Sequence, residues 1–424
     1  MKRLKDFVNP KKPWEVEGTE WREVRLGEIA EHFMGGTPKT TIEEYWNGNI
    51  PWISAKELSN CDIYITEPTR YITEKGLRES NARIAPKNSI LLVTTASVGN
   101  VAIAGVDIAI NQQITAIVPR DNICFKYMYY YLLHNAARLL LRGQTTFKHI
   151  NQKMVKKLPI ILPFRNNQPN LETQKKIVEY IEANFSIIDR ILEKKKKELE
   201  RLNELWESVL EHAFKPREGE EWREVRLGDL VIEKPKYGLT TKAKDEGKFV
   251  FLRITDIDDQ GEIKNNNFKF VDLDETEKAK YDIRKGDLLL ARSGSVGNFF
   301  IAFQDYPNWI YASYLIRFRL DLNKVHPMFV KHFLSSQYFK KWVSFQKRPG
   351  AQPNINAKEY SSFKISLPFR NNQPDLEKQK EIANYLDNIY EKIKILKEKI
   401  QSQINRLEEM KESILEEVFE HDKE

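Results

Sequence analysis

Two long stretches of the chain repeat apolar side chains at helical spacing. Residues 171–214 and 376–419 contain neither Gly nor Pro, so nothing in them interrupts a helix. In the second stretch the apolar positions advance by alternating steps of three and four residues, with one interruption at Gln403, which is the pattern of a coiled-coil seam. The first stretch keeps this period less strictly, and Lys195 interrupts it. The predicted seam residues are Ile181, Ile188, Leu202 and Val209 in the first stretch and Leu386, Ile393, Ile400, Leu407 and Ile414 in the second.

Each of these predicted helices has a favourable capping sequence at its N-terminus. A proline precedes a residue that can act as N-cap, which is Asn170 in the first helix and Asp375 in the second. At 1.5 Å per residue, each helix would be roughly 65 Å long. A helix of this length exposes its apolar stripe unless another helix covers it, and the most direct partner is the other stretch. We therefore predict that the two helices pack against each other.

The helices belong to a larger internal repeat. Residues 20–27, with the sequence Glu-Trp-Arg-Glu-Val-Arg-Leu-Gly, recur unchanged as residues 221–228. Residues 162–169, with the sequence Leu-Pro-Phe-Arg-Asn-Asn-Gln-Pro, recur unchanged as residues 367–374. The copies lie about 200 residues apart, which is far more than the period of a solenoid repeat. The pattern indicates a duplicated unit in which a globular domain is followed by a helical arm.

Short β-like runs alternate with turn signals in each globular copy. Residues 89–94 and 287–292 are typical of buried strands, and each is followed by a Gly-containing loop and a return strand. A helix rich in aromatic residues and leucine is predicted over residues 126–141 in the first copy and 327–345 in the second. The pattern predicts two similar α+β domains with mostly antiparallel or mixed strands. We place the first globular domain at 1–165, the first helix at 166–214, the second globular domain at 215–370 and the second helix at 371–424.

The globular domains and the helical parts differ in net charge. The chain of 424 residues has 68 Lys and Arg and 61 Asp and Glu residues, which gives a formal net charge of +7. Residues 1–165 carry 23 basic and 16 acidic side chains, and residues 215–370 carry 28 and 21. The two helical parts are acidic, with 8 basic and 10 acidic side chains in residues 166–214 and 9 and 14 in residues 371–424. The positive excess therefore lies on the globular domains, which favours them as the surfaces that bind a polyanion.

Signatures of catalysis are missing from the sequence. It contains no GxxxxGK[ST] phosphate loop, no HExxH zinc helix, no GxSxG nucleophile elbow and no Asn-Pro-Pro-Tyr stretch of the kind found in adenine methyltransferases. The histidines are scattered, and neither Cys61 nor Cys124 belongs to a metal-binding cluster. We therefore expect a chain that is not an enzyme and that binds no metal or cofactor. The absence of a long apolar run and of a signal peptide predicts a cytoplasmic protein with no membrane partner.

Polar loops between the predicted elements carry side chains that can hold phosphates or read the edges of bases. Corresponding loops differ between the two copies although the framework repeats, as expected if one framework reads two different sequences. Each loop taken singly also fits an ordinary solvated surface. The candidate DNA-binding residues are Thr37, Lys39, Thr40, Ser54, Lys56, Thr94, Thr95, Ser97, Gln144, Thr145, Thr146, Lys148 and His149 in the first copy, and Lys236, Tyr237, Arg253, Thr255, Arg292, Ser293, Ser295, Lys347, Arg348 and Gln352 in the second.

The order of these motifs resembles a specificity subunit of a type I restriction–modification system. The resemblance rests on Trp-Arg-Glu-Val-Arg-Leu-Gly-Glu at 21–28, Gly-Gly-Thr-Pro at 35–38, Ile-Pro-Trp-Ile at 50–53, and a strand followed by Ser-Val-Gly-Asn at 97–100. Each copy closes with Leu-Pro and then Gln-Lys-Lys-Ile at 174–177 or Gln-Lys-Glu-Ile at 379–382. The similarity spans nearly the whole chain and occurs twice in the same order.

The resemblance implies a fold and a division of labour. It implies two target recognition domains, related by a pseudo-two-fold internal repeat and separated by two long antiparallel helices that form a coiled coil. Each domain would read half of a split site in double-stranded DNA. The chain itself would do no chemistry and would bind two methyltransferase subunits and, through the assembly, the restriction subunits. S-adenosylmethionine, ATP and Mg²⁺ would then be bound by those partner subunits.

Two other classes of protein remain open from the residues alone. One is a self-contained DNA methyltransferase or nuclease fragment with its own catalytic centre. The other is a coiled-coil adaptor whose basic domains bind RNA or protein. Transfer of a labelled methyl group by the pure chain would identify the first, and competition between duplex DNA and single-stranded RNA would identify the second.

Overall fold

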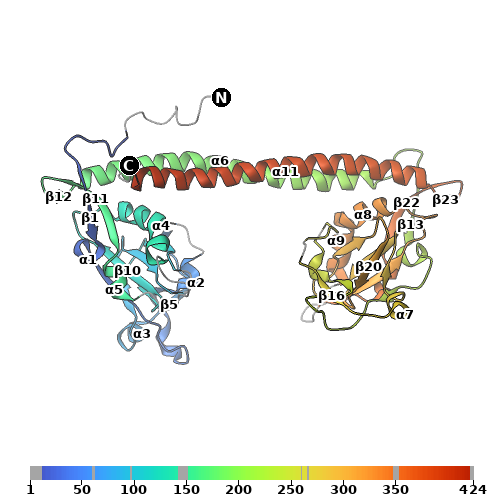
Figure 1. Ribbon diagram of the computed structural model, residues 1–424, viewed down its shortest axis with the longest axis horizontal. Helices are drawn as coiled ribbons and strands as arrows, with labels where there is room; N and C mark the ends of the chain where they lie inside the picture. Colours follow the sequence, from blue (N-terminus) through green and yellow to red (C-terminus); the bar gives the residue numbers. More distant parts are fainter. Residues whose placement is uncertain are drawn as a thin grey trace. The chain divides into compact units, whose positions relative to one another are not determined.

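The computed structural model of the protein describes residues 12–59, 63–95, 98–141, 151–258, 260–264, 267–346 and 353–420 (Figure 1). Two long helices, α6 (Leu171–Ala213) and α11 (Leu376–Phe419), each follow a globular domain in the chain. Backbone contacts divide the chain into two units, each with one globular domain and one end of each long helix. The first unit comprises residues 1–195 and 402–424, and the second comprises residues 196–401. No helix in the described part of the chain combines the length and the apolar character needed to span a bilayer.

The first unit contains three sheets. Its strands are β1 (Glu20–Arg25), β2 (Ala30–Met34), β3 (Trp46–Ile53), β4 (Tyr64–Ile65), β5 (Arg70–Ile72), β6 (Arg83–Ala85), β7 (Ile90–Val93), β8 (Val101–Ala104), β9 (Ile108–Ile110), β10 (Ile114–Pro119), β11 (Pro159–Arg165) and β12 (Gln168–Pro169). Their order within the sheets is β1-β11-β12, β2-β10-β7-β8-β4 and β5-β3-β9-β6. The shorter helices are α1 (Leu26–Ile29), η2 (Glu43–Tyr45), α2 (Ala55–Leu58), α3 (Glu74–Arg78), α4 (Phe125–Leu141) and α5 (Gln152–Lys156).

The second unit repeats this plan. Its strands are β13 (Glu221–Arg226), β14 (Lys236–Tyr237), β15 (Phe249–Leu252), β16 (Lys269–Val271), β17 (Asp282–Ile283), β18 (Asp287–Ala291), β19 (Phe299–Ile301), β20 (Tyr306–Tyr311), β21 (Leu315–Arg319), β22 (Lys364–Arg370) and β23 (Gln373–Pro374). They are ordered β13-β22-β23, β14-β21-β18-β19 and β16-β15-β20-β17. The shorter helices are η3 (Leu227–Asp229), η4 (Ile254–Asp256), α7 (Glu275–Lys278), α8 (Pro327–Ser335), α9 (Gln337–Gln346) and α10 (Ala357–Ser362).

The prediction of two similar α+β domains is confirmed by this arrangement. Most neighbouring strands are antiparallel, and the parallel pairs are β3 with β9, β4 with β8, and β15 with β20. The buried strands β7 and β18 each pair with the next strand along the chain, β8 and β19, across a Gly-containing loop. The sequence pattern predicted both of these hairpins.

The prediction of a single helix over residues 327–345 is wrong. The structure has two helices, α8 and α9, which are separated by Ser336 in an extended conformation with ψ 158°. The Ser336 hydroxyl donates a hydrogen bond to the carbonyl oxygen of Phe333 at 2.6 Å. A serine hydroxyl that bonds to the nearby backbone competes with helical hydrogen bonding, which accounts for the break.

The two unchanged motifs of each copy pair with each other. Strand β1 lies antiparallel to β11, and β13 lies antiparallel to β22. The turn after β11 contains Asn166 and Asn167 with φ 51° and 62°, and the turn after β22 contains Asn371 and Asn372 with φ 52° and 61°. Two successive left-handed residues are typical of a type I′ turn, and asparagine adopts that conformation more readily than most residues. This backbone requirement accounts for the repeated Asn-Asn pair.

Within each unit the two long helices lie side by side and antiparallel (Figure 1). In the first unit the Lys411 ammonium contacts the Asp189 carboxylate at 2.5 Å. Burial, together with the charge of Glu417, raises the pKa of Tyr180. Later residues of α11 therefore lie beside earlier residues of α6. The side chains of Asn170 and Asp375 accept hydrogen bonds from backbone N–H groups three residues later, which confirms both predicted N-caps.

Most of the predicted seam positions are buried. The side chains of Ile181, Ile188, Leu386, Ile393, Ile400 and Leu407 are buried, and those of Leu202, Val209 and Ile414 are half-buried. Near the interruption at Gln403, the neighbouring Ile404 is only 4% exposed. The apolar stripe therefore continues past the interruption, displaced by one residue.

A buried glutamine fastens each long helix to its globular domain. The Gln174 Oε1 atom accepts a hydrogen bond from the Cys124 N–H at 2.8 Å, and its Nε2 donates to the Asn122 carbonyl at 3.4 Å. In the second unit Gln379 makes the same pair of bonds, to the His326 N–H at 2.9 Å and the Lys324 carbonyl at 3.1 Å. Both glutamines are fully buried. Each glutamine side chain therefore satisfies one backbone N–H and one backbone carbonyl just before the helix that covers the sheet, which is α4 in the first unit and α8 in the second.

Replacing Gln174 by alanine should loosen the joint between α4 and α6. The Cys124 N–H and the Asn122 carbonyl would be left without these bonds, at a cost of about 1–3 kcal/mol. Hydrogen exchange of the peptide that contains residues 122–128 should become faster. The exposed neighbour Lys175 provides the matched control, because Lys175→Ala removes a long side chain from the same helical turn without touching the joint. Equal exchange rates in the two variants would contradict the assigned role.

Candidate nucleic-acid interface

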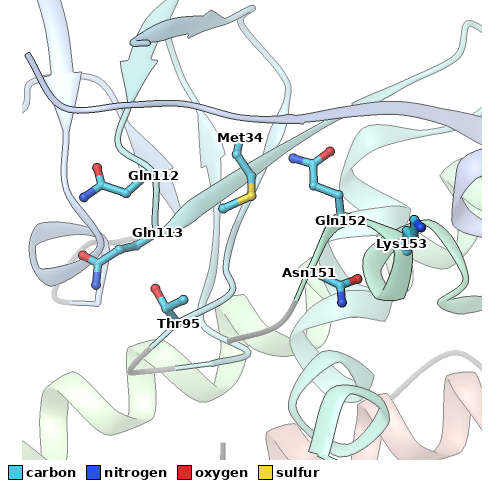
Figure 2. Close-up of a pocket in the computed structure, with 7 residues that line it drawn as sticks. All are labelled: Met34, Thr95, Gln112, Gln113, Asn151, Gln152 and Lys153. Carbon is cyan, nitrogen blue, oxygen red and sulfur yellow. The ribbon is translucent and has the colours of Figure 1, made fainter. Parts of the chain in front are cut away.

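A hollow of about 840 Å³ with several polar lining residues lies in the first globular domain. Its lining comes from four places: the end of strand β2, the loop after β7, the loop after β9 and the start of α5 (Figure 2). The lining residues are Met34, Thr95, Gln112, Gln113, Asn151, Gln152 and Lys153. Amides and a hydroxyl dominate its polar groups, and Lys153 is the only cation among these residues.

Hydrogen bonds within the domain position the two glutamines. The Thr37 hydroxyl donates to Gln112 Oε1 at 2.6 Å. The Asn111 side-chain amide donates to Gln113 Oε1 at 3.2 Å, and its oxygen accepts from the Gln113 N–H at 3.0 Å. One lone pair of each glutamine carbonyl is therefore bonded within the domain, while the second lone pair and the amide NH₂ group make no hydrogen bond to a described residue.

The loop that carries Thr37 approaches the sheet very closely. A Cβ atom at Gly35 would collide with the carbonyl oxygen of Ile110, so this position requires glycine. The Gly36 N–H donates to that same carbonyl at 3.0 Å, and the Trp52 indole donates to the Gly36 carbonyl at 3.1 Å. The Gly-Gly-Thr-Pro motif therefore holds Thr37 in place beside Gln112.

Thr95 is the buried polar residue of the hollow. Its side chain is 9% exposed, and its hydroxyl has no hydrogen-bond partner among the described residues. Thr94, the preceding residue, is fully buried, and its hydroxyl donates to the carbonyl of Gln113 at 3.2 Å. The two threonines thus differ, since Thr95 presents a hydroxyl to the hollow whereas Thr94 lies in the domain interior.

Backbone pairing identifies the equivalent surface of the second domain. The Thr94 N–H donates to the carbonyl of Gln113, and the Arg292 N–H donates to the carbonyl of Tyr314, both at 2.9 Å. Strand β14 pairs with β21 as β2 pairs with β10, which places Tyr237 at the position of Met34. Arg292, Tyr314 and Tyr237 therefore replace Thr94, Gln113 and Met34.

An arginine and two tyrosines dominate this second surface. The Arg292 guanidinium lies 4.7 Å from the centroid of the Tyr237 ring, and its Nε donates to Asn354 Oδ1 at 3.4 Å. Tyr237 is 40% exposed and Tyr314 is 59% exposed. The Tyr237 hydroxyl accepts from the Ala357 N–H at 3.2 Å, which fixes the ring on which the guanidinium stacks.

A charge network beneath strand β14 supports this surface. Arg317, whose side chain is 2% exposed, donates to Glu233 Oε1 at 3.0 Å and lies 3.3 Å from Asp282 Oδ1. Arg319 binds both oxygens of the fully buried Asp287, at 2.8 and 3.0 Å. The hydrogen bond to Asp287 raises the pKa of Arg319. Burial opposes the ionisation of Glu233, but the hydrogen bond from Lys236 and the charges of both arginines outweigh it and lower its pKa.

The predicted DNA-binding residues that the structure describes fall into three groups by exposure. Thr37, Lys39, Thr40, Lys56, Lys236, Tyr237, Thr255 and Ser295 are exposed; Ser54, Arg253, Arg292 and Ser293 are half-buried; Thr94 and Thr95 are buried. Ser97, Gln144, Thr145, Thr146, Lys148, His149, Lys347, Arg348 and Gln352 lie outside the described residues. The structure places Thr95 in the lining of the hollow and bonds Thr37 to Gln112 of that lining. It brings Tyr237, Arg292 and Ser293 to one surface.

Some predicted cations are already compensated within the protein. Arg253 binds the Asp256 carboxylate through Nε at 3.1 Å and through Nη2 at 2.6 Å. Lys236 contacts Glu233 at 2.7 Å. These contacts reduce the positive charge that the two side chains offer to a phosphate.

Gln112, Gln113, Asn151, Gln152 and Lys153 were not among the predicted site residues. The glutamines lie with Asn111 in the turn between the apolar runs of β9 and β10. Three consecutive amide side chains between two apolar runs are the signal that identifies this turn. Tyr314 and Asn354 were also missed: Tyr314 lies in the turn between β20 and β21, and Asn354 lies two residues after the predicted residue Gln352.

The chain belongs to the type I restriction–modification DNA specificity family. The family model, described as the type I restriction modification DNA specificity domain, matches residues 18–201 and again residues 219–406. This match confirms the resemblance inferred from the sequence motifs. It also assigns the chain to a class defined by recognition of DNA rather than by catalysis.

Named relatives support the assignment. The MjaIX specificity subunit of Methanocaldococcus jannaschii is 33% identical over 248 residues, which are 51% of this chain and 55% of that protein. The EcoR124I/EcoR124II specificity subunit of Escherichia coli is 31% identical over 46% of this chain and 48% of that protein. The chain thus matches about half the length of these two relatives. The MjaVIII specificity subunit of M. jannaschii is 25% identical over 91% of this chain and 90% of that protein.

A solved structure shares the fold. It comes from a study of complex assembly and conformational transition of the type I R-M system, and one of its chains superposes with a TM-score of 0.69. The two chains are 18% identical, and the superposition covers 94% of this chain and 97% of the other. At this identity the likeness extends to the fold alone.

Proposed function

We propose that this chain reads a bipartite target in double-stranded DNA as the specificity subunit of a type I restriction–modification complex. One half-site would bind to the hollow and loops of the first globular domain, and the other to the equivalent surface of the second. The observation that carries this proposal is the pair of equivalent surfaces, built on one repeated framework and carrying different side chains. A duplicated reader with divergent contact residues is suited to two different half-sites.

The two long helices would serve as spacer and docking surface. Their outer faces are acidic, which suits a protein partner better than DNA. Two methyltransferase subunits would bind to the chain, and restriction subunits would join through that assembly. S-adenosylmethionine would be bound by the methyltransferase subunits, and ATP with Mg²⁺ by the restriction subunits. The specificity chain would bind none of these three.

Methylome sequencing provides the test. A host strain that lacks restriction–modification genes would receive this chain together with its methyltransferase subunit. We expect methylated adenines within one asymmetric motif, with two defined half-sites separated by a gap of fixed length. A control strain with the methyltransferase subunit alone should lack this methylation. Methylation that is independent of this chain, or a motif without a gap, would refute the proposal.

A further inference from the structure

We propose that the two equivalent surfaces select different base pairs: the hollow of the first domain takes an A·T pair, and Arg292 of the second domain takes the guanine of a G·C pair. This inference rests on the proposed reading of DNA and assigns a chemical preference to each surface. It follows from the replacement of Gln113 and Met34, which line the hollow, by Tyr314 and Tyr237 at matched positions. Arg292, which stacks on Tyr237, takes the position of the interior residue Thr94.

The hollow offers the hydrogen-bonding pattern that adenine requires. In the major groove adenine presents an acceptor, N7, beside a donor, N6, and a side-chain amide can pair with both. The carbonyls of Gln112 and Gln113 are oriented by Thr37 and Asn111, and their NH₂ groups have no partner among the described residues. Each NH₂ can donate to N7, while the second lone pair of the same carbonyl can accept from N6. No guanidinium is among the described residues that line this hollow.

The remaining lining suits the thymine of the same pair. Thymine presents a methyl group and the O4 acceptor in the major groove. Met34 supplies a flexible apolar side chain at one wall, and Thr95 supplies both a methyl group and a hydroxyl (Figure 2). The Thr95 hydroxyl is buried without a partner among the described residues, so a base acceptor would satisfy it. A G·C pair has no methyl group to fill the space beside Met34.

The second surface is suited to guanine instead. Guanine presents two adjacent acceptors, O6 and N7, and a bidentate arginine is its most common partner. Stacking on Tyr237 fixes the plane of the Arg292 guanidinium, and the Nε bond to Asn354 fixes its rotation. Among the described residues no carboxylate pairs with Arg292, in contrast to Arg253, which binds Asp256. The two terminal nitrogens therefore remain available as a preorganised fork.

Binding of single-base variants of the target measures both preferences. The full chain, in complex with its methyltransferase subunit, would be titrated with duplexes that carry each possible base at every position of the methylome motif. We expect Arg292→Ala to lower discrimination at one G·C position of one half-site by roughly 5- to 150-fold. Gln113→Ala should lower discrimination at one A·T position of the other half-site by a similar factor. Each variant should leave the opposite half-site unchanged.

Three further variants make the test decisive. Arg292→Lys keeps the charge but loses the fork, so it should lose guanine discrimination while retaining most of the affinity. Lys153→Ala removes the cation that lines the hollow, and Lys358→Ala removes a cation next to Ala357, whose N–H bonds to the Tyr237 hydroxyl; both variants should weaken all sequences equally.

Several results would overturn the inference. A uniform loss of affinity in Arg292→Ala would make Arg292 a phosphate contact. Loss of discrimination by both variants in one half-site, or at bases of the opposite type, would equally refute it. If the unmodified complex has no sequence preference, the proposed function itself fails, which is a different result. Retained discrimination at the opposite half-site shows that each variant is folded.

Discussion

A chain with seven residues inserted into each long helix should recognise a target whose gap is about three base pairs longer. Seven helical residues add roughly 10 Å, and each base pair occupies about 3.4 Å of duplex. The insertions belong after Lys195 in α6 and after Gln401 in α11, where the chain passes from one unit to the other. A full heptad keeps the apolar stripe on the same face, so the helices can still pair. Methylome sequencing of the variant would report the new gap.

Insertion into one helix only is the matched control. The apolar stripes of α6 and α11 would then fall out of register over part of their length, so we expect loss of methylation rather than a new gap. A doubly extended chain that still recognises the original gap would show that the helices do not set the spacing.

Replacing Asp287 by alanine should destabilise the second globular domain by about 3–5 kcal/mol, because it leaves the buried charge of Arg319 without its bidentate partner. The same carboxylate accepts a hydrogen bond from the Arg284 N–H at 2.8 Å, which would also be lost. Such a change is a large part of the 5–15 kcal/mol that typically stabilises a domain. Hydrogen exchange should become faster throughout strands β18 and β21, while peptides of the first domain should be unaffected.

Asp245→Ala is the control for this variant. Like Asp287, Asp245 forms an ion pair, in this case with Lys269. The Asp245 side chain, however, is 87% exposed. An exposed ion pair contributes little to stability, so exchange in the second domain should not change measurably. Equal acceleration in both variants would mean that burial of the Asp287 network is not what stabilises the domain.

The sequence predicted the helices and the repeat because their signals are local. Apolar spacing indicates a helix, a proline followed by Asn170 or Asp375 indicates its beginning, and an unchanged motif indicates duplication. The break at Ser336 could not be predicted, since it depends on one hydroxyl that bonds to the Phe333 carbonyl rather than to solvent. Which segments of the chain make up each unit also depends on the tertiary structure. The periodicity of a helix tells which of its faces is buried but not which domain covers that face.

The sequence predicted only part of the site, because only some of its signals are local. Polar loops such as the one that contains Thr37 are visible as loops, whereas Gln112 and Gln113 lie in a three-residue turn between two apolar strands. Strand β21 contains Arg317 and Arg319, and charged residues in a strand usually indicate a solvent-exposed face. Here both arginines point into the domain, where three acidic side chains from other strands and loops compensate them. Only the tertiary structure brings these partners together.

The last helix has a consequence for biosynthesis. Leu415, Val418 and Phe419 belong to the core of the first globular domain, with Phe419 packed on Tyr127 and Tyr131 at ring distances of 5.4 and 5.3 Å. The ribosome must therefore add roughly 250 residues after that domain, which takes about 13–50 s at 5–20 residues per second, before its core can close. The second unit needs only residues 196–401 and can be completed earlier. The domain that is synthesised first is thus the last to finish folding, and a nascent chain exposes the apolar surface of α4 to chaperones throughout that interval.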